Sequence, residues 1–210
     1  MVKGKRGGRV RDKWRDKKWV VVQAPVTFGS QPVAYIPVSD EDKAVGRVVE
    51  CTLFDLWKTD PQQHTIKLYF QVERIDGNIA YTRFKGHEYA KEFLRSLIRR
   101  GSSLVSHVND YTTADGYKFR ISTIAFTQRR VNTSKKQMIR RIIDEVLISE
   151  ISKLTIDQFV QGVVGPKFNA DLHSQTKKII GVRHIAVRKT KLLTIPKAKP
   201  MANVQVEAPQ

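Results

Sequence analysis

Lysines and arginines gathered in three segments are the residues best placed to do chemistry in this chain. Residues 1–18 carry nine of them against two aspartates, residues 129–141 carry six with no acid, and residues 177–199 carry eight with no acid. Because the net charge of the chain is +18, these segments hold the whole excess and the remainder is slightly acidic. Concentrated cations release counterions from a phosphate backbone, so the pattern predicts a nucleic-acid partner. An alternative stays open, in which each run is a solvated face or tail.

The sharpest of these sites surrounds a predicted helix start. The sequence from Ser134 to Gln137 has the spacing of a capping box, and basic pairs, 129–130 and 135–136, flank it. Asn132 and Thr133 are polar residues beside that start, where a phosphate can meet unsatisfied backbone amides. Side-chain cations and amide groups therefore converge on one stretch of RNA backbone in this interpretation. An ordinary basic helix entrance is the alternative.

The predicted RNA-binding residues come from all three basic segments. Trp14, Trp19 and Tyr117 each have a ring that can stack on an unpaired base. Trp14 is included for that reason, whereas for Trp19 and Tyr117 a core position is the favoured interpretation and stacking is the alternative. The full set is Lys3, Lys5, Arg6, Arg9, Arg11, Lys13, Trp14, Arg15, Lys17, Lys18, Arg129, Arg130, Asn132, Lys135, Lys136, Arg140, Arg141, Arg188, Lys189 and Lys191.

Motifs for catalysis or metal binding are not found. The consecutive acids Asp40, Glu41 and Asp42 have the pattern of a solvated loop, and the five histidines lack the spacing of a zinc site. Cys51 is the only cysteine and is expected to be a small buried hydrophobe. No glycine loop has P-loop spacing. We therefore expect no enzyme activity, no metal and no cofactor. An RNA-processing enzyme and a DNA-binding or chromatin protein remain as rival hypotheses.

The length of 210 residues favours one folded domain with tails. We expect a basic extension at 1–18 that is disordered when free, a single RNA-binding domain at 19–195 and a flexible tail at 196–210. No apolar run approaches the roughly 20 residues that cross a bilayer, so a cytoplasmic location without membrane contact is expected.

Periodicity predicts a mixed set of elements between the tails. Strands are expected from Trp19 and over residues 45–54, 65–73, 79–84, 104–112, 117–126 and 183–192, with hairpin turns at 76–78 and 115–116. A short amphipathic helix is expected at 88–99 and further helices after Ser134, after Thr155 and over 170–180. The apolar stripe of the first long helix would be formed by Met138, Ile142, Val146, Ile151 and Leu154. The fold class is α+β, with a mostly antiparallel sheet or partly closed barrel of about six to seven strands and packed helices.

Short blocks in a fixed order make the chain resemble the archaeal and eukaryotic small-subunit ribosomal protein family S-three-a, also called S-three-Ae or S-one-e. Each block is made of common residues, and their colinearity over residues 18–197 carries the resemblance. The blocks are Lys18-Trp19 with Ala24-Pro25 and Phe28, the run Gly46-Arg47-Val48 to Leu56, Phe84-Lys85-Gly86, Thr112 to Tyr117 with Arg120, Phe126 to Arg130 with the basic residues through Arg141, and Val187 to Lys197.

This resemblance implies a structural protein of the small ribosomal subunit, in the ribosome of the cytoplasm, and favours the archaeal form. It implies a place on the platform near the 3′ end of the rRNA and the messenger exit. The implied partners are the small-subunit rRNA and neighbouring ribosomal proteins, with mRNA or initiation factors as further candidates near the exit.

Overall fold

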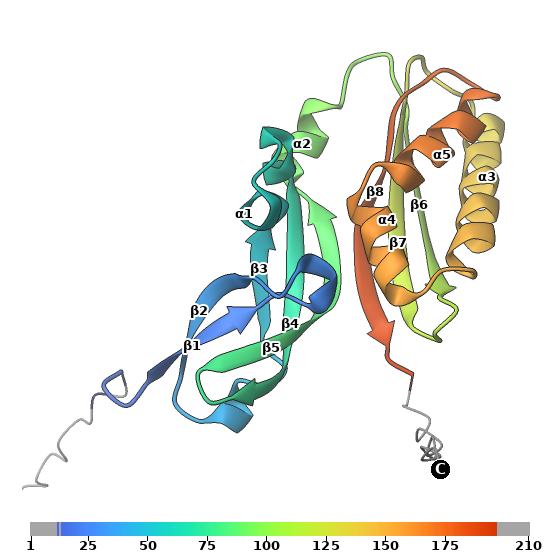
Figure 1. Cartoon of the computed structure of the whole chain (residues 1–210). Coiled ribbons are helices and arrows are strands. Elements are labelled where there is room, and N and C mark those ends of the chain that lie inside the picture. Colours follow the sequence, from blue (N-terminus) through green and yellow to red (C-terminus); the bar gives the residue numbers. More distant parts are fainter. Residues whose placement is uncertain (1–11, 13, 197–210) are drawn as a thin grey trace, which may run out of the picture. The chain divides into compact units, whose positions relative to one another are not determined.

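The computed structural model describes residue 12 and residues 14–196, and the chain divides into two compact units. Unit 1 contains residues up to 51 together with 69–84, and unit 2 contains 52–68 together with the chain from residue 85 onward. The long strands β4 (Ile66–Asp76) and β5 (Ile79–Tyr89) each contribute to both units. Figure 1 shows the elements of each unit in sequence colours.

Unit 1 is built on a small mixed sheet. Strand β1 (Lys18–Gln23) pairs antiparallel with β2 (Pro32–Val38) and parallel with β5, while β3 (Val48–Thr52) pairs with β4. Alternate residues of β1 point inward, so Val20 and Val22 are buried with Val38, Val72 and other apolar residues. The 3₁₀ turns Val26–Phe28 and Glu41–Lys43 connect these strands.

Unit 2 contains a second antiparallel ladder, in the order β5, β8 (Val182–Thr194), β7 (Lys118–Thr127) and β6 (Leu104–Thr112). In β7 the first half alternates between buried and exposed residues, whereas every residue from Thr123 to Thr127 is buried. Burial on both faces requires cover on both sides of this part of the sheet. Helix α2 (Lys91–Ser96) packs Leu94 against Ile124 and Phe126, which provides one cover.

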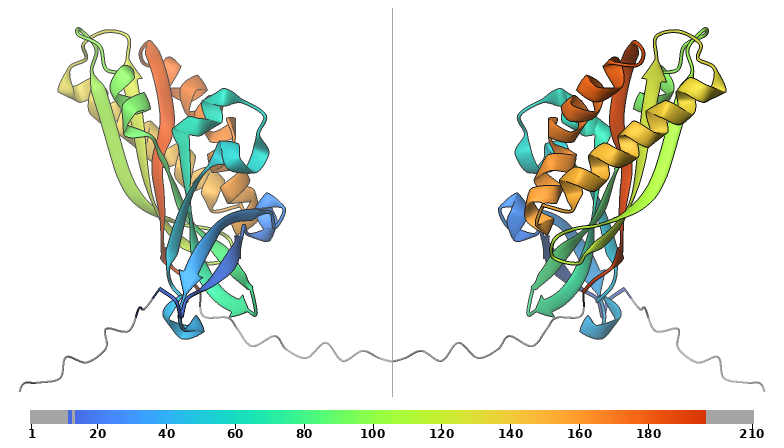
Figure 2. Two further views of the ribbon diagram at one scale, coloured as in Figure 1. Left: turned by 90° about the vertical axis from the view of Figure 1, so that its left-hand side faces the viewer. Right: turned by 90° about the vertical axis from the view of Figure 1, so that its right-hand side faces the viewer.

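Three helices cover the other face. Figure 2 shows α3 (Thr133–Ile151), α4 (Ile156–Val164) and α5 (Lys167–Lys177) lying together on one side of the β6–β7–β8 ladder. The rings of Phe119 on β7 and Phe159 on α4 lie 4.7 Å apart, and Phe159 also contacts Phe168 of α5. A short helix, α1 (Leu53–Trp57), and the 3₁₀ turn Pro61–Thr65 complete the unit.

The α+β class is confirmed, and the eight strands form a mixed, open sheet rather than a closed barrel. Strand β2 was not predicted because Pro32 and Pro37 are poor strand residues, and an edge position tolerates them. Helix α1 begins at Leu53, where a strand was expected to continue, because Thr52 and Asp55 form a capping box. A single domain over 19–195 remains a prediction, and the predicted tails lie almost wholly outside the described residues.

Two predictions about α3 are wrong. Its N-cap is Asn132 and its first residue is Thr133, so Ser134 does not cap the helix. The buried stripe is Ile139, Ile143, Leu147 and Ile151, of which Ile151 was predicted. Met138 is exposed and Ile142 and Val146 are half-buried, because most of the helix is rotated by one residue from the predicted face. By contrast, Thr155 and Gln158 do form a capping box at α4, as predicted.

The assignment of Trp19 to the core is also wrong, since its side chain is 60% exposed. Trp19 precedes the buried Val20, and strand alternation places it on the opposite face. Tyr117 is half-buried and Cys51 is buried, the latter as expected.

Candidate nucleic-acid interface

A hollow of about 430 Å³ lies beside the start of α3, and cations dominate its lining. Arg129, Arg130 and Lys135 line it together with Gln128, Ile180 and Gly181. All three cationic side chains belong to exposed residues, and the sequence from Gln128 to Ile143 contains no acid. The hollow is therefore a concave, positively charged surface that can accept an anion.

The backbone that presents the arginines is fixed at several points. The amide of Gln128 donates to the Gly181 carbonyl at 2.9 Å, which ties the end of β7 to the start of β8. The Thr127 hydroxyl donates to the Arg129 carbonyl at 2.7 Å, and the Val131 amide donates to Ser103 Oγ at 3.1 Å. Val131 is buried. The two arginines thus extend from a segment anchored on both sides, which preorganises their charge.

The first turn of α3 adds backbone donors to the same place. The Asn132 side chain makes no capping hydrogen bond, and the first helical bond is from the Lys136 amide to the Asn132 carbonyl at 3.1 Å. The amides of Thr133, Ser134 and Lys135 precede that bond and have no helical acceptor. A helix of 19 residues also carries positive dipole charge at this end. The chemistry of this helix start suits a phosphate group, whose oxygens can accept hydrogen bonds from these amides and are attracted by the dipole charge.

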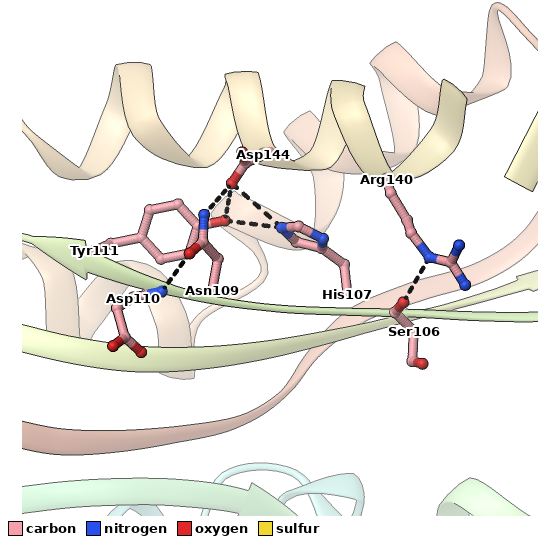
Figure 3. Close-up of polar contacts among 7 residues, drawn as sticks. All are labelled: Ser106, His107, Asn109, Asp110, Tyr111, Arg140 and Asp144. Carbon is pink, nitrogen blue, oxygen red and sulfur yellow. Dashed lines mark hydrogen bonds and ion pairs between the residues drawn. The ribbon is translucent and has the colours of Figure 1, made fainter. Parts of the chain in front are cut away.

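The direction of α3 is set by polar contacts with β6. Figure 3 shows that Arg140 reaches down from the helix, where its Nε donates to the Ser106 carbonyl at 3.0 Å. Arg140 is half-buried and contacts protein, whereas Arg141 beside it is exposed. Of these two predicted RNA-binding residues, Arg141 keeps its cation fully in solvent.

Three side chains of β6 converge on Asp144 one turn further along. The Tyr111 hydroxyl and Asn109 Nδ2 donate to Asp144 Oδ1 at 2.7 and 2.8 Å, and His107 Nε2 lies 3.2 Å from the same oxygen. Partial burial acts against the charged form of Asp144, but these hydrogen bonds outweigh burial and lower its pKa. This cluster holds the middle of α3 on the sheet and so fixes where its N-terminus lies.

The other predicted residues do not join the hollow. Lys189 donates to Glu88 across the β5–β8 pair at 2.7 Å, and Lys191 is exposed on the same strand. Arg188 lines a separate hollow of about 250 Å³ with Lys91 and Arg95. Trp14, Arg15 and Lys18 are exposed, and the Lys17 ammonium lies 3.6 Å from the Trp14 ring centre. Six predicted residues lie outside the described residues: Lys3, Lys5, Arg6, Arg9, Arg11 and Lys13.

Sequence reasoning missed the residues that complete the hollow. Ile180 and Gly181 are about fifty positions from Arg129, and the pairing of Thr127 with Val182 brings them together. A Cβ on Gly181 would lie 2.6 Å from Gln128 Oε1, so glycine permits the close approach. The apolar runs of β7 and β8 were visible in the sequence, but their register was not.

Within the described part of the chain, no group of three or more His, Cys, Asp or Glu side chains could hold a metal ion. Asp40, Glu41 and Asp42 are exposed at a 3₁₀ turn, where Lys43 pairs with Asp40. His87 is buried and donates from Nε2 to the Val187 carbonyl at 3.0 Å. Among these residues, no helix is both long and apolar enough to cross a membrane.

Comparison with known proteins gives one consistent result. The family model described as the Ribosomal S3Ae family matches residues 5–196. A protein of Desulfurococcus amylolyticus called small ribosomal subunit protein eS1 is 45% identical over 187 residues, which cover 89% of this chain and 87% of the relative. The proteins of the same name from Archaeoglobus fulgidus and Sulfurisphaera tokodaii are 41% and 42% identical and cover 93% and 89% of this chain, and 93% and 96% of their own lengths.

Proposed function

The chain belongs to the ribosomal S3Ae family, and on that premise we propose that it binds small-subunit rRNA through the hollow at the start of α3. It is a structural protein of the small ribosomal subunit, located in the ribosome of the cytoplasm, and its family is not an enzyme family. Its partners are rRNA and neighbouring ribosomal proteins. These assignments disfavour the rival hypotheses of a processing enzyme and a chromatin protein.

The observation that carries the RNA-binding proposal is the convergence of three cations and a helix N-terminus on one concave surface. Arg129, Arg130 and Lys135 supply charge, while the first-turn amides of α3 supply directed donors. Contacts of this kind fix the position of a protein on RNA without reading bases. Lys136, Asn132 and Arg141 extend the same surface along the helix. The fixed backbone of residues 127–131 favours recognition of RNA shape.

We further propose that the protein lies on the platform of the small subunit near the messenger exit. This location rests on the family resemblance of the sequence blocks and of their order along the chain. In that position the exposed surface would also face mRNA or initiation factors. The basic residues 1–18 would act as an additional RNA-binding extension, and Lys189 and Lys191 would contact RNA at a separate part of β8, away from the hollow.

Assembly in cells tests the proposal. The natural chain and a variant with Arg129, Arg130, Lys135 and Lys136 replaced by glutamine are expressed with an affinity tag, and their distribution is followed by sucrose-gradient sedimentation. We expect the natural chain to comigrate with 30S particles and the variant to shift towards the top of the gradient. Hydroxyl-radical footprinting of the rRNA in the particles then locates the contacted helices. Equal incorporation and an unchanged footprint would contradict the proposed site.

A further inference from the structure

Two large aromatic side chains of unit 1 are exposed on neighbouring strands. The Trp19 side chain on β1 is 60% exposed and that of Tyr35 on β2 is 67% exposed. Burying such rings removes 150–250 Å² each from water, so leaving both outside a core is costly unless something covers them. Neither residue supports the core of unit 1, because their neighbours Val20, Ala34 and Ile36 pack into it.

The strand register places the two rings on one face. Trp19 lies opposite Pro37, and Val21 lies opposite Tyr35. Trp19 and Tyr35 are therefore diagonal neighbours, and residues in this relation typically have Cα atoms about 7 Å apart. Val21 also lies opposite Ile79 of β5, so the face continues across three strands. The result is a flat patch of two aromatic rings with Val21, Pro37 and Ile79 beside them.

Cations lie next to this patch. Along the chain Lys17 and Lys18 directly precede Trp19, Asp16 separates them from Arg15, and residues 1–18 as a whole carry a net charge of +7. Arg47 donates from Nη1 to the Pro37 carbonyl at 3.1 Å, which places a guanidinium beside the β2 edge of the patch. A ligand that fits must present flat apolar surfaces to the rings and negative charge to their surroundings.

We propose that this face of β1 and β2 stacks the unpaired bases of single-stranded RNA on Trp19 and Tyr35. Exposed aromatic rings on adjacent strands of a sheet are a general means of stacking successive bases, while adjacent cations contact the intervening phosphates. The inference rests on the proposed RNA-binding function and assigns a second, chemically different site to it. The hollow at α3 binds phosphate, whereas the β1–β2 face binds bases.

Stacking is tested directly by the fluorescence of Trp19. The chain contains three tryptophans, so the double variant Trp14→Phe with Trp57→Phe leaves Trp19 as the only one. A short single-stranded oligoadenylate is titrated into this full-length protein, with an RNA duplex of equal length for comparison. We expect the oligoadenylate to quench Trp19 and the duplex to leave it unquenched, because bases inside a duplex are already stacked.

Substitutions measure the contribution of each ring. Because one stacked base contributes about 1–3 kcal/mol, Trp19→Ala and Tyr35→Ala should each weaken oligoadenylate binding by about 5- to 150-fold. Trp19→Phe keeps a ring and should retain most of the affinity. Trp57→Ala removes an exposed tryptophan of unit 2 and serves as the matched control with no effect. Both test residues lie on the solvent face, and circular dichroism melts check that the variants fold.

The salt dependence separates this site from the proposed hollow. Trp19→Ala should lower affinity without changing the slope of log K against log salt, because no counterion contact is removed. If rRNA binds through the hollow but Trp19→Ala and Tyr35→Ala bind oligoadenylate as tightly as the natural chain, the stacking site is refuted and the proposed function stands. If Trp19 is quenched by purified neighbouring ribosomal proteins and not by oligoadenylate, a protein covers the face and the inference is wrong.

Discussion

The Tyr111 hydroxyl donates a 2.7 Å hydrogen bond to Oδ1 of Asp144, joining β6 to the middle of α3. Burial of Tyr111 raises the pKa of its phenol, and the neighbouring carboxylate raises it further, so the hydroxyl keeps its proton. Asn109 donates to the same carboxylate oxygen. Because α3 carries Lys135 on its first turn and Arg129 and Arg130 lie just before the helix, this polar cluster links the stability of the helix to the presentation of the proposed binding surface.

Replacing Asp144 with alanine should destabilise the fold. The change leaves the Tyr111 hydroxyl and the Asn109 amide without their acceptor, at a cost of about 2 kcal/mol in the free energy of unfolding. Urea denaturation at neutral pH measures the loss. Glu145→Ala, at an exposed position of the same helix, provides a comparison. Equal stabilities of the Asp144→Ala variant and the natural chain would show that the cluster does not hold α3.

The same carboxylate should make stability sensitive to acid. Because the folded-state pKa of Asp144 is lowered, its contribution is present above the unfolded-state pKa of about 3.9 and is lost as the pH falls through the folded value. Asp144→Asn removes the titration while keeping an oxygen acceptor. We expect the stability difference between the natural chain and Asp144→Asn to shrink below about pH 4, as measured by urea midpoints at a series of pH values.

His87 should make the stability of the fold depend on pH as well, over a higher pH range than Asp144. Complete burial lowers its pKa to about 4, and the ring is held neutral between Thr190 Oγ1 at 2.8 Å and the Val187 carbonyl. Only the unfolded chain takes up a proton on His87 between about pH 6.5 and 4. The stability that the neutral ring contributes is therefore fully present above about pH 6.5 and is lost as the pH falls. This group should make the protein about 2 kcal/mol less stable at pH 5 than at pH 7.5.

The His87→Gln variant isolates that effect. Its urea midpoints should depend less on pH between 5 and 7.5 than those of the natural chain, since the remaining groups are unchanged. Parallel pH profiles for the two proteins would contradict the assignment of this dependence to His87.

Gly86 on β5 should be hard to replace. An added Cβ would lie 2.2 Å from the Thr190 carbonyl oxygen, a backbone atom of β8 that cannot rotate away. Gly86→Ala should therefore cost about 3 kcal/mol in unfolding free energy or prevent folding. Gly77→Ala is the control, because nothing lies within 4 Å of its added Cβ and only its φ of 58° is strained. Its cost should be about 1 kcal/mol, and equal losses in the two variants would contradict the packing explanation.

Local patterns predicted most elements because each has a local cause. The turn at Asp115-Gly116 joins β6 to β7, and Thr155 caps α4, as their residue types indicated. The start of α3 was misplaced because Asn132 ends the preceding extended segment without a side-chain cap. Trp19 was misassigned because hydrophobicity alone does not say which face of a strand meets the core, and only the register with β2 decides it.

The candidate site was predictable in its charges and not in its shape. Arg129, Arg130 and Lys135 stood out from sequence, since no acid interrupts them. The hollow that they line also includes Ile180 and Gly181, which the β7–β8 register brings beside them, and this register is a long-range feature. Lys189 was predicted to bind RNA, but the sequence could not show that Glu88 pairs with it across two strands.

The central claim is that the hollow at α3 contacts rRNA phosphates, and the salt dependence of binding tests it most directly. Binding of an rRNA fragment identified by footprinting is measured over a series of salt concentrations. The control variant replaces four cations that already pair with carboxylates, Lys43, Arg74, Lys118 and Arg120, by glutamine. It removes the same net charge as the glutamine variant of Arg129, Arg130, Lys135 and Lys136. We expect the hollow variant to bind more weakly, with a log K against log salt slope smaller in magnitude by about three to four, and the control to keep its slope. Equal slopes in the natural chain and the hollow variant would contradict the account.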